Sequence, residues 1–248
     1  MLLAAASAAG WVDAVVGGGG LVLIPVLLLV FPGLAPATAL GTNKLTALAG
    51  TASAAIRLFP RTPLRWPALL GAFAVAATCS STGAYIAARL PVSVFKPVVL
   101  VLLVAVGIFV ATRPQFGTAE ADTTRTKAAT LSALGLAAVL IAFYDGIMGP
   151  GTGTFMIIAL TAIAGMTFLE SSATAKVLNS GTNVGALIVF AAQGNVLWLL
   201  GLALGVANIV GAQLGAHMAL GRGAGFVRVV LLAVVVVMVS KLGYDMLG

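Results

Sequence analysis

The apolar positions of this chain form eight long stretches, and short loops between them hold most of the charged residues. A membrane-spanning helix needs about 20 apolar residues. The stretches cover approximately residues 1–31, 37–58, 66–88, 94–112, 128–165, 171–192, 196–220 and 227–247. This pattern predicts an all-α integral membrane protein with several passes through the bilayer.

The first and fifth stretches exceed one span, and glycine and proline interrupt them midway. The interruptions lie at residues 17–20, followed by Pro25, and at residues 146–153. Lipid cannot hydrogen-bond the backbone groups that such a break releases, so protein or a water-filled cavity must surround it. Each stretch is therefore either one discontinuous helix that crosses the membrane, or a re-entrant hairpin that enters and leaves on the same side.

The two interrupted stretches belong to an internal duplication. A shift of 132 residues, without a gap, aligns matching residues along most of the chain. The informative matches involve residue types that are scarce here: Asp13 with Asp145, Lys44 with Lys176, Trp66 with Trp198, and Lys96 with Arg228. The alignment predicts two homologous repeats of four segments each, residues 1–112 and 128–248, joined by a linker at residues 113–127.

The basic residues in the loops favour an inverted orientation of the second repeat. Eleven of the 13 Lys and Arg residues lie outside Lys44 and Lys176. If all eight stretches cross the membrane, these eleven divide seven to four between its two sides. Hairpins at the first and fifth stretches instead give eight to three. The positive-inside rule prefers the larger imbalance, which makes the two repeats inverted.

Composition supports a membrane location and narrows the function. The chain is 61% hydrophobic and 8% charged, with a mean hydropathy of +1.16, whereas a soluble domain carries about 25% charged residues. The net charge of +7 comes from loop residues and not from a basic groove for nucleic acid. One cysteine, one histidine and the lack of a Walker loop or nucleophile elbow argue against zinc, ATP and hydrolase chemistry. We expect no enzyme activity, no metal and no cofactor.

The glycine-rich breaks are candidate anion sites. Half-helices that meet at a break direct a positive dipole end and free N–H groups toward the membrane centre, as in transporters built from repeats. We expect the backbone of both breaks to bind substrate: Gly17, Gly18, Gly19, Gly20, Gly149, Gly151, Thr152 and Gly153. The alternative is that these glycines only allow tight packing.

Two lysines inside predicted helices are further candidates. A charge at the bilayer centre costs about 2.5–3.5 kcal/mol on insertion scales, so it needs a partner, a cavity or a route to the interface. Lys176, Asn179 and Asn183 are spaced i, i+3, i+7 and share one helix face. Asn43 and Thr42, next to Lys44, supply a shorter version in the first repeat. Such a stripe facing a pore can coordinate an oxyanion, whereas a lysine near a helix end can instead reach the headgroups.

Asp13 and Asp145 each precede a break by one helical turn. Three roles fit both aspartates: lining the cavity, pairing with a lysine, or carrying a coupling proton or cation. Simpler structural roles are expected for Glu170, at a helix end, and for His217, as an interhelical hydrogen-bonding group. Gly201, Gly205, Gly211 and Gly215 have the four-residue spacing of close helix packing.

The motifs around these residues resemble those of the sulfite exporter TauE/SafE family, also called the 4-toluene sulfonate uptake permease family. The resemblance rests on Gly10-Trp-Val-Asp-Ala-Val-Val-Gly-Gly-Gly-Gly20 with Pro25, on Ala39-Leu-Gly-Thr-Asn-Lys44, and on Tyr144-Asp-Gly-Ile-Met-Gly-Pro-Gly-Thr-Gly153. It covers almost the whole chain except the linker. It implies a multi-pass permease of the prokaryotic inner membrane for sulfur-containing anions such as sulfite, sulfonates or sulfoacetate.

Together these observations predict a secondary anion transporter that works by alternating access between two repeats. Its expected partners are a small anion, the lipid bilayer and a coupling proton or cation, and not nucleic acid. An anion channel is the main alternative, followed by a scaffold role and by an intramembrane hydrolase that uses Asp13 and Asp145. The identity of the anion, the direction of transport and the oligomeric state, with a homodimer as one option, stay open.

Overall fold

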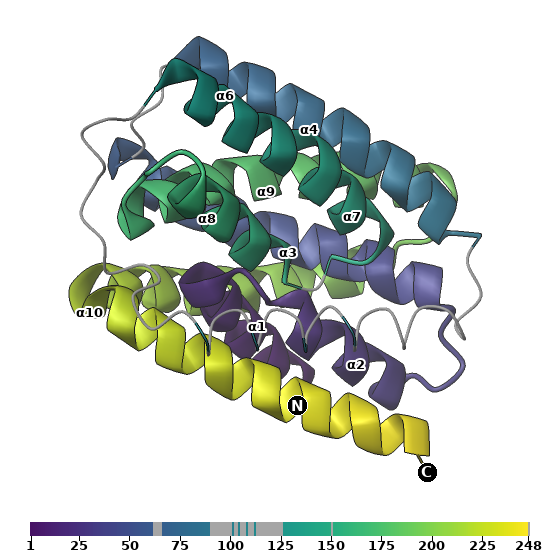
Figure 1. Cartoon of the computed structure of the whole chain (residues 1–248). Coiled ribbons are helices and arrows are strands. Elements are labelled where there is room, and N and C mark those ends of the chain that lie inside the picture. The colour runs from purple at the N-terminus through teal and green to yellow at the C-terminus, as the bar shows by residue number, and fades with distance from the viewer. Residues whose placement is uncertain are drawn as a thin grey trace.

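The computed structural model describes residues 1–61, 66–89, 126–149 and 151–247, with single residues at 101, 104, 108 and 112 (Figure 1). The described part of the chain is helical throughout. The elements are α1 (Leu2–Val16), α2 (Gly20–Val30), α3 (Pro36–Leu58), η1 (Phe59–Arg61), α4 (Trp66–Ala87), α6 (Lys127–Gly135), the π-helical turn η2 (Leu136–Ile141), α7 (Ala142–Ile147), α8 (Thr152–Ala162), α9 (Phe168–Ala192) and α10 (Trp198–Leu247). The fourth predicted stretch and most of the linker lie outside the described residues, apart from those single positions and residues 126 and 127.

Three helical segments among the described residues are long and apolar enough to cross a membrane: Trp66–Ala87, Lys127–Ile147 and Trp198–Ala219. Helices α3 and α9 are as long, with 23 and 25 residues, but they carry the lysines and most of the buried asparagine and threonine side chains. In Figure 1, α3 and α9 lie between one layer of α4, α6 and α7 and another of α1, α2 and α10. The most polar long helices are therefore the most enclosed.

Both interrupted stretches fold back on themselves as helical hairpins. In the first, Ala6 and Ala9 of α1 pack with Leu23 and Leu27 of α2, and Gly19 contacts Ala9 across the turn. This pairing of early α1 with late α2 makes the two helices antiparallel. In the second, α8 packs back along α6 and η2 in the same way. A single straight helix with a break is therefore excluded for both stretches in this structure.

The central helices α3 and α9 run antiparallel. Gly41, near the start of α3, contacts Phe190 near the end of α9, and further along Asn183 Nδ2 donates to Thr51 Oγ1 at 3.2 Å. Helix α4 packs along α9, and α10 packs along α3. These contacts connect the first and second halves of the chain throughout the interior.

The predicted packing role of the glycines in α10 is confirmed. A Cβ atom at Gly211 would overlap the carbonyl oxygen of Ser7, and one at Gly215 would lie 2.6 Å from the carbonyl oxygen of Trp11. Gly201 lies equally close to Leu45 of α3. Only glycine allows α10 to approach α1 and α3 this closely.

Several contacts occur twice, at positions that differ by 132. Gly83 lies against the carbonyl oxygen of Phe143, and Gly215 lies against that of Trp11. Likewise, Ser81 Oγ donates to Gly185 O at 2.9 Å. At the matching positions, Gln213 Nε2 donates to Ser53 O at 3.0 Å. The offset of the sequence pattern thus recurs in the packing.

Two further expectations concern helix ends. Thr167 and Glu170 form a capping box at the start of α9, as expected for Glu170 at a helix end. The stretches predicted at residues 196–220 and 227–247 are both helical and belong to one element, α10, of which, among the described residues, only Trp198–Ala219 is long and apolar enough to span a membrane. A straight helix of 50 residues would be about 75 Å long. Figure 1 shows α10 bending back, and Phe226 in its later part lies edge-to-face against Trp11 of α1.

Candidate functional site

The breaks depend on glycines in left-handed backbone conformations. Gly17 ends α1 with φ +80°, and its N–H donates to Asp13 O at 2.7 Å. In the second break Gly149 and Gly151 have φ +82° and +78°. Glycine adopts this region without steric cost, whereas other residues do not. The local sequence therefore dictates where both helices stop.

The two breaks touch each other. Gly153 N donates to Gly17 O at 3.1 Å, and the Thr154 hydroxyl donates to the carbonyl oxygen of Val16. A Cβ atom at Gly17 would overlap the backbone of Gly153. The two breaks thus converge in the structure, through direct backbone contact.

Each buried lysine pairs with the aspartate of the opposite half of the chain. Lys44 Nζ lies 2.6 Å from Asp145 Oδ2 and donates to Asp145 O at 2.8 Å. Lys176 Nζ lies 3.1 Å from Asp13 Oδ2 and also donates to the carbonyl oxygen of Asp13. The two lysines are only 2% and 1% exposed. The lysines therefore do not reach the headgroups. Of the three roles expected for the aspartates, the structure shows pairing with a lysine.

These pairs make the site electrically neutral. The ammonium groups meet both a carboxylate and a carbonyl oxygen near the carboxyl end of α1 or α7, where the helix dipole also favours positive charge. Removing one partner of such a buried pair leaves an uncompensated charge. The structure therefore contains two compensated charge pairs beside the breaks.

The predicted amide ligands have different surroundings. Asn43 is 6% exposed and has no hydrogen-bond partner among the described residues, and its Nδ2 faces Gly20. Asn179 Oδ1 accepts from Thr182 Oγ1 at 3.1 Å, and Asn183 binds Thr51. The Thr152 hydroxyl donates to Gly149 O at 2.8 Å, within its own break.

The structure thus assembles the predicted residues in two groups. The first group lies between α1, α2, α3 and α9 and contains Asp13, Lys176, Asn43 and residues 18–20. The second group lies at the turn between α7 and α8 and contains Lys44, Asp145, Gly149 and Thr152. Gly17 and Gly153 join the breaks, and no contact of Asn183 with either ion pair is present in the described part of the chain.

Two residues of the site were missed in the sequence. Thr154 joins the two breaks, and Thr51 binds Asn183. Thr51 lies 132 positions before Asn183, so applying the repeat offset to every candidate residue would have identified it. No sequence signal distinguishes Thr154 from the other buried threonines.

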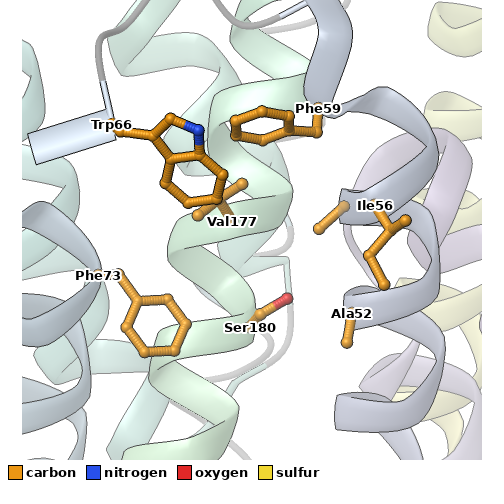
Figure 2. Close-up of a pocket in the computed structure, with 8 residues that line it drawn as sticks. Ala52, Ile56, Phe59, Trp66, Phe73, Val177 and Ser180 are labelled. Carbon is orange, nitrogen blue, oxygen red and sulfur yellow. The ribbon is translucent and has the colours of Figure 1, made fainter. Parts of the chain in front are cut away.

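A cavity of about 390 Å³ lies between α3, α4 and α9 (Figure 2). Its lining consists of Ala52, Ala55, Ile56, Phe59, Trp66, Phe73, Val177 and Ser180. Figure 2 shows the rings of Phe59, Trp66 and Phe73 around Val177. The Ser180 hydroxyl already donates to Lys176 O at 2.8 Å. This apolar lining does not suit an anion, and none of the predicted site residues belongs to it.

His217 has the interhelical role predicted for it. Its Nδ1 lies 3.2 Å from Arg57 Nη2, and Arg57 Nη1 donates to Gln213 Oε1 at 3.0 Å. These side chains connect the end of α3 with α10 at the exposed surface. They are separate from both ion pairs.

The chain is similar over almost its whole length to proteins that are named as probable membrane transporters. The family model described as "Sulfite exporter TauE/SafE" matches residues 2–242. The "Probable membrane transporter protein ORF9" of Sinorhizobium sp is 36% identical over 245 residues, which cover 98% of this chain and 92% of that protein. The "Probable membrane transporter protein YfcA" of Escherichia coli (strain K12) is 33% identical over 248 residues, 100% of this chain and 90% of that protein. No solved structure matches the chain.

Proposed function

Since the chain belongs to the sulfite exporter TauE/SafE family of membrane transporters, we propose that it is a secondary transporter of small sulfur-containing anions. It works in the prokaryotic inner membrane by alternating access between two repeats. The observation that carries this proposal is the pair of buried ammonium groups beside two touching helix breaks. An ammonium group whose paired carboxylate is protonated, together with backbone N–H groups, suits an oxyanion.

The repeats in this proposal are homologous and inverted. The contacts that recur at an offset of 132 support homology, because equivalent residues meet equivalent partners. The antiparallel course of α3 and α9 is in keeping with inversion. In transporters of this kind, the two repeats exchange conformations around a substrate site at their interface.

The crossed ion pairs suggest how anion and proton movements are coupled. An oxyanion competes with the carboxylate of Asp13 or Asp145 for the paired ammonium group. A proton that neutralises the carboxylate frees the lysine for the anion. One proton then moves with each negative charge, so uptake does not work against the membrane potential, which costs about 2.3 kcal/mol per charge per 100 mV. Export is favoured by the potential even without a proton.

The substrate lies at the repeat interface in this proposal. The substrate is held by backbone N–H groups of both breaks and by the ammonium groups of Lys44 and Lys176. The amide groups of Asn43, Asn179 and Asn183 also bind it. One of the two aspartates, Asp13 or Asp145, carries the coupling proton. Opening of one hairpin at a time gives access from one side at a time.

The test is anion flux in proteoliposomes that contain the purified protein. Sulfite, sulfate, taurine and sulfoacetate are offered with and without a pH gradient. We expect saturable flux of at least one of them that increases when protons can accompany the anion. The control is the folded Lys44→Ala, Lys176→Ala double variant, in which flux should be lost. A lack of flux for every anion under every gradient would overturn the proposal, and flux proportional to concentration would indicate a channel.

A further inference from the structure

The two ion pairs at the breaks are not equivalent. Lys44 and Asp145 lie 2.6 Å apart, and both side chains are 3% exposed. Lys176 and Asp13 lie 3.1 Å apart, and the Asp13 side chain is 12% exposed. The ion pair of Asp13 is therefore the longer of the two, and the Asp13 carboxylate is more accessible than that of Asp145.

The surroundings of Asp13 contain hydrogen-bond donors without acceptors. Asn43 is 94% buried and unpartnered within the described residues, and a Cβ atom at Gly20 would lie 3.4 Å from its Nδ2. The N–H groups of Gly18 and Gly20, at the start of α2, likewise have no acceptor in the described part of the chain. Gly19 N approaches Asp13 Oδ1 at 3.4 Å, which places these donors next to the carboxylate.

The equivalent positions in the second break are occupied or apolar. Thr152 stands where the first break has Gly20, and its hydroxyl binds Gly149 O. Ala175 stands where the first repeat has Asn43, so no side-chain amide is available there. A Cβ atom at Gly149 would lie 3.3 Å from both Lys44 Nζ and Asp145 Oδ1. In the second break, protein groups therefore already occupy the positions that correspond to the free donors of the first break.

We propose that the anion and its coupling proton share one asymmetric site, formed by Asp13, Lys176, Asn43 and the N–H groups of Gly18 and Gly20. The pair of Lys44 and Asp145 instead holds the two hairpins together. This inference rests on the proposed transport function and narrows it from two half-sites to one. Lys176 is the charged residue in contact with Asp13 among the described residues. On neighbouring elements, Lys44 faces Asp145 and Arg57 faces His217.

The exchange at this site balances in charge. With Asp13 ionised, the pair with Lys176 is neutral. One proton on the Asp13 carboxylate leaves the ammonium group of Lys176 uncompensated. An anion with a single negative charge then restores neutrality, and its oxygen atoms accept from Asn43 Nδ2 and the two backbone N–H groups. The site therefore takes up one proton with each singly charged anion.

The first experiment measures the dissociation constant of sulfite for the purified protein in lipid nanodiscs. We expect Asn43→Ala to raise this constant at least tenfold. Gly20→Ala should raise it as well, because the added methyl group would lie against Asn43 Nδ2, in the space proposed for the anion. The methyl group makes only ordinary van der Waals contacts, so the fold should tolerate it. Thr46→Val is the control, since Thr46 is equally buried on α3 and binds Gly201 O instead. An unchanged constant in folded Asn43→Ala and Gly20→Ala would overturn the single site.

The second experiment counts protons taken up per sulfite bound, in a weakly buffered solution that is acidic enough to keep sulfite as the singly charged hydrogensulfite ion. We expect Asp13→Asn to abolish the uptake and Asp145→Asn to preserve it with a lower unfolding temperature. Uptake that persists in Asp13→Asn, or that is lost equally in both variants, would overturn the asymmetric site while sulfite transport by the wild type still upheld the proposed function. Wild-type protein that neither binds nor transports any tested anion would overturn both.

Discussion

At the scale of residues, the central feature is that neither half of the chain neutralises its own buried charges. Lys44 and Asp13 lie in the first half, and Lys176 and Asp145 lie in the second, yet both pairs form between the halves. A buried pair is stable because each charge compensates the other in a medium of low dielectric constant. Loss of one member is therefore more harmful than loss of both.

This reasoning gives a prediction for the Lys44 pair. Lys44→Met leaves the Asp145 carboxylate buried without its partner, so the free energy of unfolding should fall by about 3–5 kcal/mol. The double variant Lys44→Met, Asp145→Leu should recover most of that loss, because no charge remains buried. Thermal unfolding in detergent, followed by tryptophan fluorescence, measures both. A double variant that is as unstable as the sum of its single changes would contradict the pairing.

The sequence identified these four residues but not their pairing. Asp and Lys are rare in this chain, and both recur at the offset of 132, which was enough to select them. Which aspartate meets which lysine depends on how the hairpins cross, over separations of 101 and 163 residues. No local pattern contains that information. For the same reason, the sequence left open whether the aspartates pair with the lysines.

At the scale of elements, the glycines that end α1 and α7 define the hairpins. Gly17 combines a φ of +80° with direct contact to the backbone of Gly153. Gly135, in α6, has ordinary helical surroundings and nothing within 4 Å of an added Cβ atom. These two glycines therefore serve very different purposes, although both lie in apolar helices.

The difference between them leads to opposite predictions for alanine. Gly17→Ala introduces a Cβ atom in a left-handed conformation, which costs about 1–2 kcal/mol, and it also forces the two breaks apart. We expect a marked drop in unfolding temperature and loss of transport. Gly135→Ala should leave stability unchanged or raise it by up to about 1 kcal/mol. Parallel thermal unfolding of both variants tests this, and equal effects would argue against the contact between the breaks.

The apolar pattern predicted most helices and both breaks correctly, because hydrophobic length and glycine placement are local properties. The sequence predicted the shape of the two interrupted stretches less well. A single rod and a hairpin contain the same residues, and the sequence separated them only by a small difference in loop charge. The contact of Ala9 with Gly19 shows that the first stretch is a hairpin. Such a contact between two helices is a tertiary feature that a local sequence pattern does not contain. The continuous run of α10 was likewise not predicted, since Gly221, Gly223 and Gly225 resemble a loop in the sequence.

At the scale of the whole molecule, the arrangement in the membrane distinguishes inverted repeats from eight crossings. With re-entrant hairpins, the end of α3 that carries Arg57 faces the cytoplasm and the carboxyl terminus lies outside. With eight crossings, the carboxyl terminus lies inside. Antiparallel packing of α3 with α9 agrees with the first arrangement.

A reporter fused after Gly248 tests this arrangement. We expect alkaline phosphatase at that position to be active and green fluorescent protein to be dark, as in the periplasm. Reporters inserted at residues 113–125 provide the control, because both arrangements place that linker on the cytoplasmic side. A fluorescent carboxyl-terminal fusion would contradict the inverted arrangement.

The crossed ion pairs also have a consequence for biosynthesis. Lys44 enters the bilayer before Asp145 exists, because 101 residues separate them in the chain. At about 5–20 residues per second, the ribosome needs roughly 5–20 seconds to supply the partner. During that interval the nascent first half carries an unmatched cation and an unmatched carboxylate among lipids. The insertion machinery or transiently bound water must shelter them until the second half arrives.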